Sequence, residues 1–119
     1  MASDDARKRF VALAVRAMRN ILIDHARRRA AGKRGGDWQR LTLSEELPVV
    51  AANDGTLLDL EAALQQLERL NARSAQIAEL RLFGGLSVRE IAPMVGVSAT
   101  RAKEDWHYAR AVLGKFLAG

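Results

Sequence analysis

The stretch "LSVREIAPMVGVSATRAKEDW", residues 86–106, decides the fold because two short helical patterns flank a glycine turn. Glu90 follows Ser87 at the spacing of a capping box, which predicts that a helix begins at Ser87. Gly96 is placed to end that helix, and Ser98 to cap a second helix that continues almost to the C-terminus. Two helices joined in this way, with basic residues early in the second, are the plan of a helix-turn-helix.

The start of the second helix is suited to enter a DNA major groove. Arg101 suits a bidentate contact to guanine, while Lys103 and Arg89 suit phosphates. Free N–H groups at the capped helix starts suit the nucleic-acid backbone. The candidate DNA-binding residues of this region are Arg89, Ser98, Thr100, Arg101, Lys103 and Glu104.

Three residues of this stretch oppose strong DNA binding. Pro93 lacks the N–H that would bond the carbonyl of Arg89, so the first helix is expected to kink or tighten there. Glu104 and Asp105 lower the positive potential where DNA would approach, although a carboxylate at 104 is able to accept from N4 of cytosine. A plain helical hairpin in an all-α core therefore remains the alternative.

The N-terminal third predicts one long helix. Ser3 is a candidate cap, two acids follow in the first turn, and nothing interrupts the helical pattern before Gly32. Apolar residues cover an arc of roughly 200°, which is wider than one packing partner needs. We expect a second copy to cover Val11, Val15, Met18 and Leu22, as an antiparallel homodimer or a higher oligomer through residues 10–23. The alternative is that the C-terminal domain folds back onto this face.

The remaining pattern predicts an all-α chain with a long N-terminal helix (1–36), a linker (37–55) and a four-helix C-terminal domain (56–119) containing the helix-turn-helix. In the linker, Trp38, Pro48 and the turn-like "AANDG" sustain neither a helix nor a strand. From Thr56 a helical stripe returns, and Asn71 is placed to cap the next helix through Phe83. The inward positions of these two helices are expected to be Leu57, Leu60, Leu64, Leu67, Ile77 and Leu80.

The charge of the chain is positive, +5, and unevenly distributed. Residues 1–40 hold 11 Lys/Arg against 4 Asp/Glu, residues 41–72 hold 1 against 6, and residues 73–119 hold 7 against 4. Basic ends are the footprint of polyanion binding, although a solvated charged face gives the same pattern. Charge alone leaves both interpretations open.

Several function classes are disfavoured by composition. The chain has no cysteine, and His25 and His107 fall on different predicted helices, so we expect no metal site and no cofactor. Because no nucleophile with a base and no paired acids occur, we expect no enzyme. No apolar run approaches the ~18 residues of a membrane span, and we expect a cytoplasmic protein.

Two segments carry a family resemblance. "LEAALQQLERLNARSAQIAELRLFGGLSVREIAPMVGVSATRAKEDWHYARAVL" resembles the C-terminal helix-turn-helix domain of extracytoplasmic-function (ECF) sigma factors of bacterial RNA polymerase. "RKRFVALAVRAMRNILIDHARRRAAGKRGG" is similar to the last helix of the promoter-melting domain of that family. The two segments occur in the family's order and together cover nearly the whole chain.

The resemblance implies binding to promoter DNA and to core RNA polymerase. The recognition helix would read the upstream promoter element through Arg101, Lys103 and Glu104, with Thr100 beside them. The first helix would contact the downstream element. The first-helix residues implied are Arg16, Arg19, Asn20, Arg27, Arg28 and Arg29.

The sequence departs from the family pattern at three points. Relatives usually carry clamp-binding helices before the first helix, and here Met1 lies only nine residues before Phe10. Relatives also tend to have a basic residue at position 104 and a residue other than proline at 93. The hypotheses are therefore an initiating sigma factor, a shortened regulatory relative, or a protein-interaction module that uses the apolar face of the first helix.

Overall fold

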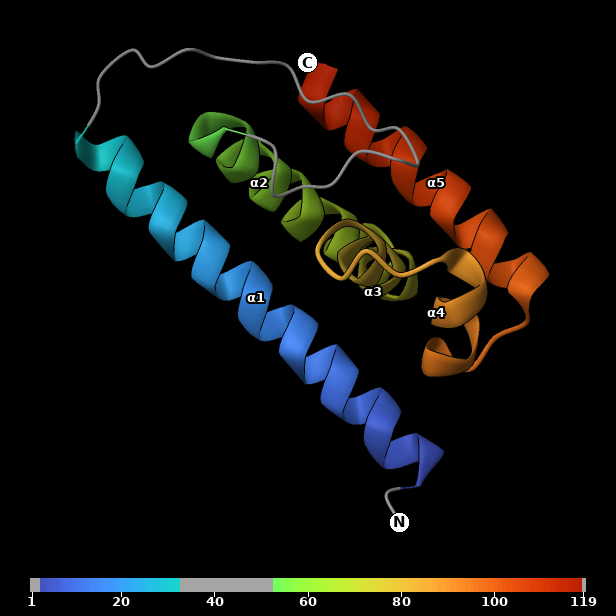
Figure 1. Cartoon of the computed structure of the whole chain (residues 1–119). Helices are drawn as coiled ribbons and strands as arrows, with labels where there is room; N and C mark the ends of the chain where they lie inside the picture. The colour runs from blue at the N-terminus through green and yellow to red at the C-terminus, as the bar shows by residue number, and fades with distance from the viewer. Residues whose placement is uncertain (1–2, 33–52, 119) are drawn as a thin grey trace.

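A computed structural model describes residues 3–32 and 53–118, and all regular elements in these ranges are helices. They are α1 (Asp4–Gly32), α2 (Asp54–Leu70), α3 (Ala72–Leu82), α4 (Val88–Val95) and α5 (Ala99–Ala118). The predicted all-α class is confirmed, and residues 37–52 of the expected linker lie outside the described ranges. In Figure 1, α1 runs along one edge of the molecule with α2–α5 on the same side of it. None of the described helices combines the length and apolar composition that a bilayer span requires.

Side-chain caps determine where the first three helices begin. The Ser3 hydroxyl accepts from the Ala6 N–H at 3.1 Å, as its position predicted. α2 begins at Asp54, two residues before the expected start, because Asn53 Oδ1 accepts from the Thr56 N–H at 2.8 Å. Asn71 then ends α2 and caps α3 within one residue: its N–H donates to the Leu67 carbonyl, and its side chain accepts from Ser74.

The core joins one face from each of α2, α3, α4 and α5. The largest side chains that are fully buried are Leu60, Leu64, Leu67, Ile77, Leu80, Ile91, Trp106 and Leu113. The Trp106 ring lies under two guanidinium groups, with Arg81 and Arg110 each 6.0 Å from its centroid. Full burial of each large apolar side chain contributes about 1.5–3 kcal/mol, and this set therefore holds the four helices together.

The C-terminal helices also cover one side of α1, which corrects an expectation from the sequence. Val15 is buried, Val11 and Leu22 pack against the same core, and α1 contacts α2, α3 and α4. A second copy of the chain is therefore not what covers these three residues. The side chain of Val15 approaches Gly84 so closely that a Cβ at position 84 would lie 2.8 Å from Val15 Cγ2. Met18, at the margin of this face, stays half exposed.

Candidate nucleic-acid interface

α4 begins with the predicted capping box. The Glu90 N–H donates to Ser87 Oγ at 3.1 Å, and the Ser87 N–H donates to Glu90 Oε1 at 2.9 Å. The hydrogen bonds from the backbone and side chain of Ser87 hold the pKa of Glu90 below its ordinary value. Pro93 lies inside α4 with its ring exposed, and the helix ends two residues later at Val95, so little regular structure depends on the missing N–H.

The turn between α4 and α5 comprises residues 96–98. Gly96 adopts φ 76°, a left-handed conformation that glycine takes without steric cost, and the Val97 N–H donates to the Ala92 carbonyl at 3.1 Å. Ser98 then caps α5, since its hydroxyl accepts from the Arg101 N–H at 3.1 Å. This short hydrogen-bonded turn sets the direction in which the first residues of α5 project.

The first two turns of α5 have one exposed polar side and one buried side. Ala102 and Trp106 are buried in the core and fix the rotation of the helix about its axis. The sequence-predicted residues of α5 lie together on the exposed side, and Arg89 of α4 and Ser98 of the turn are also exposed. The exposed residues of this surface are Arg89, Ser98, Ala99, Thr100, Arg101, Lys103 and Glu104.

The two acids of α5 have different environments. Asp105 is buried and anchors α5 to α3: Arg73 Nε donates to Asp105 Oδ2 at 2.7 Å and Arg73 Nη2 to Oδ1 at 3.4 Å. Glu104 projects into solvent and lies 3.7 Å from Arg101 Nη1. Arg101 Nε lies 3.7 Å from Asp105 Oδ1 as well. The expected loss of positive potential at this surface therefore comes mainly from Glu104, because Arg73 already neutralises Asp105.

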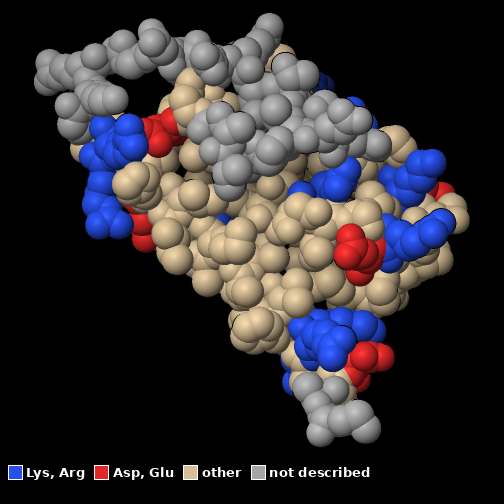
Figure 2. Space-filling view, viewed as in Figure 1, with Lys and Arg blue, Asp and Glu red and all other residues tan. Residues whose placement is uncertain are grey.

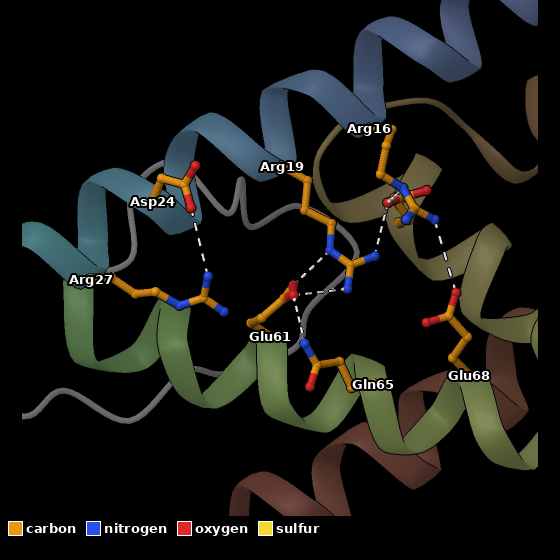
Figure 3. A network of polar contacts seen from close by, with 8 residues as sticks. Arg16, Arg19, Asp24, Arg27, Glu61, Gln65 and Glu68 are labelled. Carbon is orange, nitrogen blue, oxygen red and sulfur yellow. Dashed lines mark hydrogen bonds and ion pairs between the residues drawn. The ribbon is translucent and has the colours of Figure 1, made fainter.

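α1 is joined to α2 and α3 by a network of charged side chains. Arg19 donates from Nε to Glu61 Oε1 at 2.7 Å, from Nη2 to Glu61 Oε2 at 3.2 Å, and from Nη1 to Glu79 Oε1 at 2.8 Å. Arg16 Nε lies 2.7 Å from the same Glu79 oxygen, and Arg16 Nη2 lies 3.9 Å from Glu68. Arg16 and Arg19 thus both point from α1 toward the glutamates (Figure 3).

Arg19 is consequently an internal residue in this arrangement of the helices. Burial by itself lowers the pKa of Arg19, but hydrogen bonds and charges from Glu61 and Glu79 outweigh that effect and raise the pKa above its ordinary value. The guanidinium stays charged and paired at any physiological pH. Arg19, which the sequence placed on a DNA-binding face, is therefore enclosed between helices, whereas Arg16 and Asn20 remain exposed.

The three consecutive arginines at the C-terminal end of α1 are exposed. Arg27 lies 3.6 Å from Asp24, and Arg29 Nε lies 3.2 Å from Asp54 at the start of α2. Arg28 Nε reaches the Asp24 carbonyl at 3.5 Å. In Figure 1 this end of α1 lies across the molecule from the α4–α5 turn, and Figure 2 shows separate basic groups at the two places. Among the described residues, the basic groups of α1's C-terminal end and of the α4–α5 turn therefore lie on separate surfaces.

The described residues contain few arrangements of side chains that could bind a metal ion. His25 of α1 and His107 of α5 are both exposed. Within residues 3–32 and 53–118, no group of three His, Cys, Asp or Glu side chains is placed to hold a metal ion.

Sequence reasoning missed the internal roles of Glu61, Glu79 and Asp105. The sequence does contain an indication of such roles, because Arg19 and Asp105 each interrupt a stripe of apolar residues on their helix. Arg19 lies four residues after Val15 and four before Ile23, both buried, and Asp105 lies between buried Ala102 and Ala109. A charge at a core register of a helix indicates a partner of opposite sign on the facing helix.

Comparison with known proteins identifies the family. Searches of the curated proteins and of the solved structures gave no significant match. The family model described as ECF sigma factor matches residues 2–118, which is nearly the full length and includes both α1 and the α4–α5 pair. With its all-α fold and its exposed basic start of α5, the chain belongs to the ECF sigma factor family.

Proposed function

We propose that this chain binds promoter DNA through the start of α5, using α4 and α5 as a helix-turn-helix, during bacterial transcription initiation or its regulation. Sigma factors of this family bind DNA and core RNA polymerase. The observation that carries the proposal is the polar surface of α5, which Ser98 caps and Trp106 anchors to the core. A rigid, basic helix start of this kind is what direct reading of a major groove requires.

The residues at the start of α5 and Arg89 of α4 make different contacts with DNA. Arg101 reads a base edge once it exchanges the 3.7 Å contact with Glu104 for a guanine, because a bidentate contact to guanine is shorter and stronger. Lys103 and Arg89 neutralise phosphates on either side. Ser98 positions the N-terminal N–H groups of α5 near the nucleic-acid backbone.

The second basic surface, at the C-terminal end of α1, is the part that contacts the downstream element. Arg27, Arg28 and Arg29 are exposed there, and their ion pairs with Asp24 and Asp54 are 3.2 Å or longer. Arg19 is left out of this surface because it is buried between α1, α2 and α3. A role for Arg19 in DNA binding would require α1 to separate from α2 and α3.

Fluorescence anisotropy with promoter-like and scrambled DNA duplexes at two salt concentrations tests the α5 surface. Arg101→Ala should lose about 1–3 kcal/mol on the preferred site and relax the sequence preference. Lys103→Ala should weaken both duplexes equally and reduce the salt slope by about one counterion. Lys115→Ala is the matched control, since it removes one exposed charge from the other end of the same helix.

Two results would contradict the proposal. The wild-type chain could fail to bind either duplex at low salt, which would remove DNA as a ligand of this chain. Alternatively, Lys115→Ala could lower the affinity as much as Arg101→Ala, which would show that binding follows net charge and not the α5 surface.

The second candidate function is binding to polymerase or to another protein without reading DNA. It is favoured by the two carboxylates near Arg101 and by the enclosure of Arg19 between helices. A pull-down with core polymerase, run beside the DNA titration, separates the two functions. Retention on polymerase with no DNA binding by the isolated chain would support this second candidate.

A further inference from the structure

The outward face of α1 carries a stripe of apolar side chains that the described residues leave uncovered. Phe10, Leu13 and Ile21 are 72%, 71% and 66% exposed, and Met18 is half exposed beside them. Helices α2–α5 all lie on one side of α1 (Figure 1), so within the described residues no helix packs against the stripe. Figure 2 shows an almost uncharged surface along α1 between its two basic ends. Exposed apolar patches of this kind mark interaction sites.

The spacing within the stripe is that of a helix which pairs with another helix. Phe10, Ala14, Ala17 and Ile21 are separated by four, three and four residues, which is the heptad alternation of a helix-pair seam. The two large side chains lie at the ends of the seam, and the two alanines lie at its centre. Small central residues allow two helix backbones to approach closely.

The seam is complementary to itself when a second copy runs antiparallel about a two-fold axis. In the register that places Ala14 opposite the partner copy's equivalent of Ala17, Phe10 lies opposite Ile21, and each pair occurs twice. One turn further out, the same register places Arg7 opposite Asp24, both of which are exposed. Parallel pairing would instead bring identical charges together at positions 7 and 24.

We propose that the outward face of α1 is the interface of a homodimer, formed by an antiparallel pair of α1 helices centred between Ala14 and Ala17. The occupant is a second copy because the end charges select it: Arg7 and Asp24 attract their counterparts only in this antiparallel register. The 62% exposed side chain of Asp24 pairs with Arg27 at 3.6 Å and retains an oxygen for a second cation. The dimer uses neither the α5 surface nor the buried face of α1, so it leaves the α5 surface free.

Sedimentation equilibrium from nanomolar to roughly tens of micromolar protein is the test. The wild-type mass should rise from 13.1 kDa toward about twice that value. Ile21→Glu should hold the chain as a monomer, because it places two carboxylates against the Phe10 rings. Leu70→Glu is the matched control, because Leu70 has the same size as Ile21 and a similar exposure, 60%. Leu70 lies at the end of α2, outside the proposed interface. Far-UV circular dichroism checks that both variants remain folded.

A charge exchange tests the register. Arg7→Glu alone and Asp24→Arg alone should each weaken the dimer several-fold, and the double variant should restore it, because opposite charges face each other again. A wild-type chain that stays monomeric at the highest concentration overturns the proposal. An Ile21→Glu variant that dimerises as well as Leu70→Glu also overturns it, and failure of the double exchange to restore dimerisation overturns the antiparallel register.

Discussion

Replacing Arg19 by methionine removes the guanidinium that joins α1 to α2 and α3. In the folded chain this group donates to Glu61 and Glu79 at 2.7–3.2 Å, and the side chains of Arg19 and Glu79 are 7% and 6% exposed. Methionine replaces the apolar stem of arginine but ends short of the guanidinium, so it keeps much of the apolar packing and removes the charge. The change therefore tests the charge at this position rather than the packing.

The size of the effect follows from what each carboxylate retains. Removal of one partner from a buried ion pair costs about 3–5 kcal/mol, because an uncompensated charge is left behind. Glu79 keeps Arg16 Nε at 2.7 Å, and Glu61 keeps Gln65 at 3.3 Å, so neither is fully orphaned. We therefore expect the free energy of unfolding to fall by about 3 kcal/mol, at the low end of that range.

Urea denaturation followed by circular dichroism measures this loss. Arg28→Met is the matched control, since it makes the same substitution at an exposed position of the same helix and should change the stability by less than about 0.5 kcal/mol. Combining Arg19→Met with Glu61→Gln should cost less than the sum of the single changes, by about 0.5–3 kcal/mol, because the two groups interact directly. An Arg19→Met variant as stable as Arg28→Met would refute the reasoning.

Three further outcomes are expected. Glu104→Arg should raise non-specific DNA affinity and steepen its salt dependence by about two counterions at most, and an unchanged salt slope in anisotropy would show that this face stays away from DNA. Asp105→Asn should destabilise the fold by about 1–3 kcal/mol in urea through its lost charge pairing with Arg73, whereas Glu104→Gln, at a 62% exposed site, should not. Ser87→Ala should raise the pKa of Glu90 toward its ordinary value in an NMR titration. In the native chain the lowered pKa means that the cap contributes at neutral pH and is lost as the pH falls through that pKa.

Local patterns predicted the helices well because their caps act within a few residues. Ser87, Gly96 and Ser98 each make the hydrogen bond or adopt the backbone conformation that the sequence indicated. The start of α2 was misplaced by two residues because "AANDG" is typical of a turn and was assigned to the linker, whereas its Asn53 caps the helix. Exposed basic residues of α5 were also predictable, since the helical period separates them from Ala102 and Trp106.

The relation of α1 to the other helices was not predictable in the same way. Periodicity showed that α1 has more apolar surface than one neighbour covers, but it did not show which half the C-terminal helices would cover. The contact that was formed includes Glu61 and Glu79, which lie 42 and 60 residues from Arg19. The only local indication of such long-range ion pairs is the arginine that interrupts the apolar stripe of α1.

The close approach of Gly84 to α1 gives a way to detect this arrangement in other members of the family. A Cβ at position 84 would lie 2.6 Å from the Leu80 carbonyl oxygen of α3 and 2.8 Å from Val15 Cγ2 of α1, so a larger residue would require both helices to shift. In relatives with a larger residue at this position, we expect the first helix to lie farther from the C-terminal helices. We expect glycine at 84 to occur together with an arginine at 19 and a glutamate at 79, so that three positions in different parts of a sequence would vary as a set.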